Sequence, residues 1–62
     1  MTLDEVLEDI TAINDDTYIT LIINKRQIRG KWYEDHILRH CDREVEFFSV
    51  HVSQNSVTII LK

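Results

Sequence analysis

The sequence predicts an α+β fold, in which an N-terminal helix packs on a four-stranded, mainly antiparallel sheet made of two hairpins. Two observations predict it. Four short β-type segments can be paired so that apolar residues stand opposite apolar residues, and an amphipathic segment at the N-terminus can cover one face of the resulting sheet. All 62 residues are assigned to a single small domain with one core.

Residues 3–10 are expected to form the helix. Thr2 and Glu5 have the spacing of a capping box, in which each side chain accepts a hydrogen bond from the backbone N–H of the other residue. The apolar positions follow the i, i+3, i+4, i+7 rule and form one stripe. These positions are Leu3, Val6, Leu7 and Ile10.

The first hairpin is expected to join a strand at residues 17–24 to a strand at residues 27–33. A two-residue turn at Lys25-Arg26 gives the best match of apolar positions. Under that register Gly30 provides space opposite a large side chain. The resulting pairs are Ile23–Ile28, Leu21–Gly30 and Ile19–Trp32.

The second hairpin is expected to join residues 45–53 to residues 56–62, with its turn at Gln54-Asn55. A slip of one residue would turn every apolar side chain to the wrong face, so the agreement favours a real pairing. The resulting pairs are Val52–Val57, Val50–Ile59 and Phe48–Leu61.

The segment between the hairpins, residues 34–43, is predicted to be a short helix or a loop at the rim of the sheet. Ile37 and Leu38 favour a short helix there. The alternative is a true crossover helix, which would give a split βαβ arrangement with a parallel pair of strands.

Alternation of side chains assigns each strand residue to one of two faces. The helix is expected to cover the first face: Ile19, Leu21, Ile23, Ile28, Trp32, Phe48, Val50, Val52, Val57, Ile59 and Leu61. The second face should then meet water: Tyr18, Thr20, Ile22, Arg29, Lys31, Tyr33, Val45, Phe47, Ser49, His51, Thr58 and Ile60.

The second face is unusually rich in apolar and aromatic side chains for a solvent-facing sheet surface. It is therefore predicted to bind a protein partner or a second copy of the chain, unless residues 34–43 fold over it as a lid. The function predicted is non-enzymatic protein binding. Apolar contact is assigned to Tyr18, Ile22, Tyr33, Phe47 and Ile60, and orientation of the partner to Arg29 and Lys31.

The charges are segregated along the chain, and two alternative functions follow. Residues 1–24 contain six acids and no Lys or Arg, and they could imitate phosphates and inhibit a nucleic-acid-handling or defence enzyme. A basic segment at residues 25–31, beside Tyr18 and Tyr33, could instead bind single-stranded nucleic acid, but the net charge of −4 argues against it. The acids are Asp4, Glu5, Glu8, Asp9, Asp15 and Asp16.

The residues with metal-binding or nucleophilic chemistry are few. His36 and His40 have the i, i+4 spacing of a zinc pair, but Cys41 would point about 100° away from His40 on a helix. A sheet this small also offers little concavity for a substrate. We therefore predict no metal, no cofactor and no catalytic residue.

The sequence predicts a cytoplasmic protein that does not enter a membrane. Its one cysteine cannot form an intrachain disulfide, and no stretch approaches the roughly 20 apolar residues that span a bilayer. The first residues are acidic where a signal peptide would be basic.

The order of segments resembles a diffuse class of very small accessory proteins of phages and mobile elements of Gram-positive bacteria. The resemblance lies in an acidic leading helix, an apolar strand, a Gly-bearing second strand, an Arg-Glu-Val entry to a third and a final apolar strand. It implies an accessory role, which in some members is inhibition of host defence enzymes, and it supplies no catalytic residue. The matching segments are Leu3–Ile10, Tyr18–Ile23, Ile28–Trp32, Arg43–Val45 and Val57–Leu61.

Overall fold

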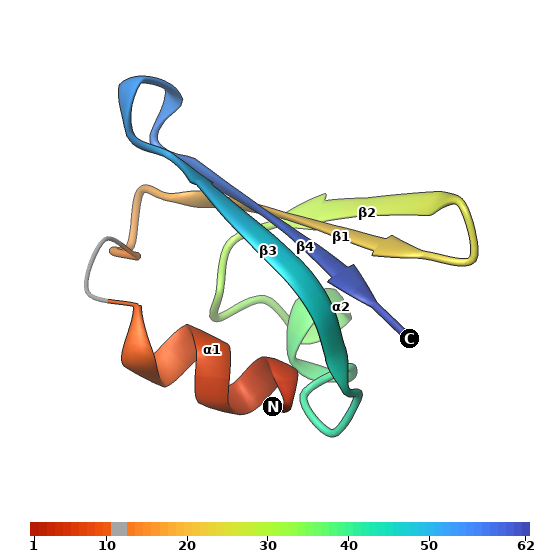
Figure 1. Cartoon of the computed structure of the whole chain (residues 1–62). Helices are drawn as coiled ribbons and strands as arrows, with labels where there is room; N and C mark the ends of the chain where they lie inside the picture. Colours follow the sequence, from red (N-terminus) through yellow and green to blue (C-terminus); the bar gives the residue numbers. More distant parts are fainter. Residues whose placement is uncertain (11–12) are drawn as a thin grey trace.

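A computed structural model describes residues 1–10 and 13–62 of the chain. The predicted α+β architecture is confirmed: a helix at the N-terminus, four strands and a short helix between the second and third strands (Figure 1). In chain order the elements are α1 (Leu3–Asp9), β1 (Tyr18–Ile23), β2 (Arg26–Gly30), α2 (Asp35–Leu38), β3 (Val45–His51), the 3₁₀ helix η1 (Val52–Gln54) and β4 (Ser56–Leu61).

The four strands form one mixed sheet in the order β2-β1-β4-β3. The two hairpins, β1–β2 and β3–β4, are antiparallel as predicted, but β1 and β4 lie side by side in parallel at the centre. The parallel pair arises because α2 and the loops around it carry the chain from one edge of the sheet to the other before β3 begins (Figure 1). β2 and β3 are therefore the two edge strands.

The predicted capping box is present at the start of α1. The Thr2 hydroxyl accepts a hydrogen bond from the Glu5 N–H at 3.4 Å, and the Glu5 carboxylate accepts one from the Thr2 N–H at 3.2 Å. Leu3 and Val6 are buried in the core, and Leu7 and Ile10 pack against it, so the predicted apolar stripe is confirmed.

The first hairpin turns one residue earlier than predicted. Its turn residues are Asn24 and Lys25, both with positive φ, as a type I′ turn requires. Every expected pair is consequently wrong by two positions, for example Ile19 opposite Gly30, yet a shift of two leaves each side chain on its predicted face.

The strand β2 ends at Gly30, before Trp32 and Tyr33, which we had assigned to the sheet. The Glu34 carboxylate accepts a hydrogen bond from the Lys31 N–H at 2.6 Å, and the Lys31 carbonyl accepts one from the Glu34 N–H at 3.1 Å. These two bonds turn the chain away from β1, so Trp32 is half-exposed instead of covered.

The second hairpin also departs from the expected register by two positions, with Val50 opposite Val57. Its connection is η1 followed by Asn55 in the left-handed region, so Val52 leaves the sheet and is largely exposed. An irregularity between Val45 and Phe47 places Val45 opposite Leu61 and against the core, so our assignment of Val45 to the second face is wrong.

The connector between the hairpins lies on the same side of the sheet as α1 (Figure 1). Ile37 is completely buried in the core, and the carbonyls of Cys41 and Arg43 accept hydrogen bonds from the N–H groups of Asp4 and Leu3. The alternative in which residues 34–43 cover the second face is therefore wrong, and none of the described helices covers that face. No helix of the described residues is long and apolar enough to cross a membrane.

Gly30 allows the connector to approach β2 closely. A Cβ atom at Gly30 would lie 2.8 Å from Cε1 of His36 and nearer still to its Nε2. His36 Nε2 lies 2.9 Å from the carbonyl oxygen of Arg29, which can only accept a hydrogen bond, so Nε2 carries the proton.

Gly30→Ala is expected to lower the free energy of unfolding by about 1 kcal/mol, because the imidazole must move and give up this hydrogen bond. Denaturant titration would measure the loss, and the same change in a His36→Ala background should cost much less. Equal losses in the two backgrounds would show that the contact with His36 is not the cause.

Candidate protein-binding surface

The uncovered face of the sheet is organised in rows that cross the strands. One row pairs Ile22 of β1 with Ile60 of β4, and Ile60 with Phe47 of β3. The next row carries hydroxyl groups from Thr20, Thr58 and Ser49. The sites predicted on this face are therefore split into two groups with a polar row between them.

The first group is the apolar row Ile22, Ile60 and Phe47. Ile22 and Ile60 are half-buried between neighbouring strands, whereas 60% of Phe47 is exposed at the edge of the sheet. Three adjacent apolar side chains with an exposed aromatic ring at one end form a continuous contact surface. The structure thus brings together three of the predicted partner-binding residues.

The second group consists of Tyr18, at the other end of the face, together with Lys31 and with Arg29, which pairs with Thr20 and reaches the tyrosine with its side chain. The Arg29 guanidinium carbon lies 4.8 Å from the centre of the Tyr18 ring, and Lys31 Nζ lies 4.7 Å from it. Lys31 Nζ also lies 3.4 Å from the carbonyl oxygen of Asp15. The two cations are therefore held on the tyrosine instead of projecting freely toward a partner.

Tyr33 does not belong to the predicted surface. It lies in the turn after β2, where its ring meets that of Trp32 edge-on with the centroids 5.6 Å apart. The indole Nε1 of Trp32 donates a hydrogen bond to the Asp15 carboxylate at 3.1 Å. This aromatic pair is fixed to the loop before β1 and is separate from the apolar row.

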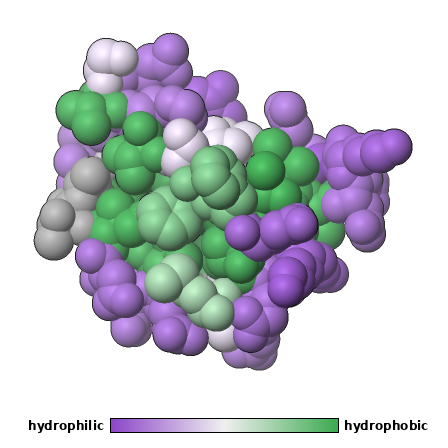
Figure 2. Space-filling view, in the orientation of Figure 1, coloured by the Kyte–Doolittle hydropathy of each residue, from purple (hydrophilic) through white to green (hydrophobic). Residues whose placement is uncertain are grey.

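Three further exposed apolar residues near the β3 edge are not among the predicted partner-binding residues: Phe48, Val50 and Val52. Phe48 and Val50 point to the helix side of the sheet, and we expected α1 to cover them, but α1 has only 7 residues and both remain partly exposed. We name the apolar group along this edge the β3 surface (Figure 2). It comprises Phe47, Phe48, Val50, Val52 and Ile60.

The edge of β3 beside this surface is largely free. Only its start is occupied, where the Val45 N–H donates to the Met1 carbonyl at 2.7 Å and Thr2 forms an isolated bridge with Glu44. From Phe47 to His51 no described strand pairs with β3 on the side away from β4. Its backbone N–H and C=O groups on that side are available to another chain.

The two edge strands differ in how they discourage pairing. β2 is a short strand of 5 residues that carries Arg26 and Arg29. Charged side chains and short length are the usual protection of an exposed edge. β3 has 7 residues, and Glu46 and His51 are its only ionisable ones. The protein therefore protects one edge of its sheet and leaves the other with exposed apolar side chains, Phe47 on one face and Phe48 and Val50 on the other.

The acidic residues predicted as an alternative site are all exposed. Glu5 is engaged in the capping box and Asp15 in the bond to Trp32, while α1 contains no basic residue. Because Leu3 is bonded to Arg43 and Val45 to Met1, α1 starts next to the start of β3. The acids of α1 thus lie near the start of β3, where the Met1 amine and Lys62 also act on Glu44.

The structure does not bring His36, His40 and Cys41 together as a metal site, and the described residues contain no group of three or more His, Cys, Asp or Glu side chains that could hold a metal ion. His36 is bonded to Arg29, as described above. Burial, and after it the nearby charges of Asp4 and Asp42, raises the pKa of the Cys41 thiol, which disfavours the nucleophilic thiolate.

Comparisons with protein-family models, with curated proteins and with solved structures found no match to this chain.

Proposed function

We propose that the protein is a non-enzymatic binding module that takes up an extended apolar segment of a partner protein along the edge of β3. The observation that carries the proposal is the unprotected edge itself, where no described strand pairs with the outer side of β3 from Phe47 to His51 and apolar side chains are exposed on both faces. A segment added there would gain backbone hydrogen bonds, and its alternate side chains would contact Phe47 on one face and Phe48 and Val50 on the other.

The charge around the edge indicates a partner with basic residues. α1 starts beside β3 and carries four exposed acids with no base among them. Lysines or arginines that flank the apolar segment of the partner would complement these acids and accelerate association. The acidic residues of the alternative hypothesis then contribute to the same interface.

A second copy of the chain is less well suited to this edge. Two copies joined antiparallel through β3 would place both α1 helices on the same face of a continuous sheet, each near the twofold axis. The acids of the two helices would then approach one another, and each chain carries a net charge of −4. The proposed occupant is therefore a different protein.

Single-stranded nucleic acid would need free aromatic faces on which bases can stack. The Tyr18 ring already has two cations against it, and Phe47 stands among apolar neighbours.

The predicted place of the chain among phage or mobile-element accessory proteins stays a prediction.

Val50→Lys tests the proposal by protecting the β3 edge as β2 is protected. Val50 is 37% exposed, so lysine can be accommodated without entering the core. The parent and the variant are each used as bait in a lysate of the source organism. The variant should fail to capture proteins that the parent captures, because partner pairing would bury the new charge.

Leu38→Lys is the matched control, since Leu38 is 38% exposed and lies on α2, beside the opposite edge of the sheet. It should retain what the parent retains. Loss of the same proteins from both variants, or from neither, would contradict the proposal. A stable dimer of the parent in light scattering that Val50→Lys dissociates would show that the occupant is a second copy.

A further inference from the structure

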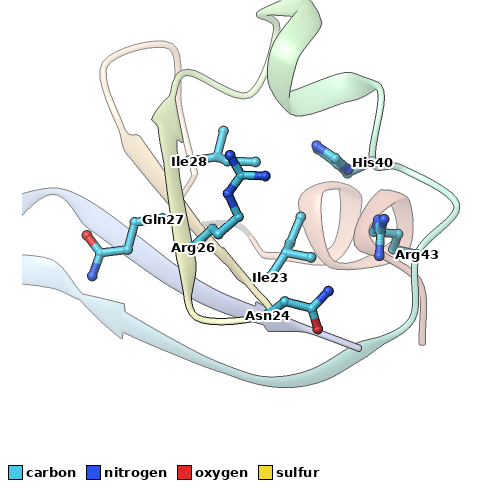
Figure 3. Close-up of a pocket in the computed structure, with 7 residues that line it drawn as sticks. All are labelled: Ile23, Asn24, Arg26, Gln27, Ile28, His40 and Arg43. Atoms are coloured by element: carbon cyan, nitrogen blue, oxygen red, sulfur yellow. The ribbon is translucent and has the colours of Figure 1, made fainter.

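A second feature lies at the opposite edge of the sheet, where the β1–β2 hairpin extends beyond the helices. It is a pocket of about 380 Å³, which is within the size range of small-molecule sites. β1, β2, their turn and the connector after α2 all contribute to it (Figure 3). The lining residues are Ile23, Asn24, Arg26, Gln27, Ile28, His40 and Arg43.

The pocket gathers basic side chains from two separate parts of the chain. Arg26 belongs to β2, whereas His40 and Arg43 belong to the connector, and Figure 3 shows the His40 imidazole turned toward the Arg26 guanidinium. No carboxylate lines the pocket. This concentration of positive charge stands out in a chain whose net charge is −4.

The two guanidinium groups are free to bind an anion. Among the described residues the single ion pair joins the Met1 amine to Glu44, so neither Arg26 nor Arg43 is paired with an Asp or Glu side chain. Arg43 donates one hydrogen bond, to the Lys62 carbonyl at 3.1 Å, and keeps its other donors. A planar guanidinium with spare N–H groups suits phosphate oxygens.

Two of the lining residues are apolar. Ile23 and Ile28 face into the pocket, while the Gln27 side chain points to the other side of β2 (Figure 3). An anionic group held by the cations would therefore lie next to an apolar surface that accepts a hydrocarbon or planar group. Inorganic phosphate alone would leave this surface unused.

The positive surroundings also act on His40. Burial lowers the pKa of His40, and the charges of Arg43 and Arg39 lower it further. A bound dianion would oppose the effect of the two arginines and favour the imidazolium. His40 can thus add a third cationic donor when an anion is present.

We propose that this pocket binds a small phosphate ester, with the phosphate between Arg26, His40 and Arg43 and the apolar part of the ester against Ile23 and Ile28. The site is independent of the β3 surface, because β2 and β3 are opposite edges of the sheet. Failure of one proposal therefore leaves the other in place.

The test is a titration of the protein with phenyl phosphate and with inorganic phosphate, followed by NMR chemical shifts of the His40 ring and of the arginine side chains. Phenyl phosphate should bind more tightly than inorganic phosphate, and Arg26→Gln should weaken its binding about tenfold. Arg26 is exposed and has no described side-chain partner, so its replacement should leave the fold intact. Arg39→Gln, which removes a neighbouring cation outside the pocket, should change affinity less than about twofold.

Sulfate provides a pH test because it stays dianionic across the range in which His40 titrates. Its binding should strengthen as the pH is lowered through the depressed pKa of His40, and His40→Asn should remove this dependence. The proposal is wrong if no titration is seen at millimolar ligand, if Arg26→Gln and Arg39→Gln have equal effects, or if phenyl phosphate and inorganic phosphate bind equally.

Discussion

Phe47→Asp is expected to weaken binding of the partner protein by about 100-fold or more, while the protein stays folded. Phe47 is the most exposed aromatic side chain of the β3 surface, and its neighbour on the face is Ile60. In a complex its ring would be enclosed between apolar groups, and a carboxylate there would lose its water without gaining a counter-ion. Each factor of ten in affinity corresponds to about 1.4 kcal/mol, which an aromatic anchor readily supplies.

Stability should change far less than affinity, because Phe47 contributes little to the core of the free protein. We expect Phe47→Asp to lower the free energy of unfolding by about 1 kcal/mol, the range of β-sheet preference between the two residues. Isothermal titration calorimetry with the captured partner would measure the affinity. Tyr33→Asp replaces an aromatic ring of comparable exposure that lies off the sheet, and it should bind normally. Equal weakening by both variants would remove the β3 surface from consideration.

Ile37→Ala is expected to lower the free energy of unfolding by about 3 kcal/mol. Ile37 is completely buried and belongs to the same core cluster as Leu3, Val6 and the central strands. Its truncation would leave a cavity where the connector, α1 and the sheet meet. A domain of 62 residues has little stability to lose, so a large part of the variant should be unfolded at physiological temperature.

Leu38→Ala is the control for this change, since Leu38 is the next residue of α2 and is partly exposed. It should cost less than about 1 kcal/mol in the same denaturant titration. Similar losses for the two variants would show that the connector does not complete the core in solution.

The sequence predicted the faces of the sheet better than it predicted the turns. Both hairpins are displaced by two positions from the expected register, and a displacement of two keeps each residue on its face. Apolar pairing therefore could not distinguish the two registers. The first turn depends on Lys25 adopting a positive φ, which the side chain of lysine does not favour, so composition gave no indication of it.

The β3 surface could be predicted only in part. Phe47 and Ile60 follow from strand alternation, whereas Phe48 and Val50 required knowledge of how far α1 extends over the sheet. The irregularity after Val45 also reverses the face of that residue without any glycine or proline to mark it. The pocket at Arg26 was missed because its cations come from β2 and from the connector, which only the fold brings together.

Amide hydrogen exchange of the protein, alone and saturated with its captured partner, measures strand addition at β3 most directly. We expect slowing of outward-facing amides within residues 47–51, because their N–H groups would bond to the added segment, and no change in the other edge strand, residues 26–30. Protection confined to residues 26–30, or to α1 with β3 unchanged, would contradict the proposal that β3 is the binding edge.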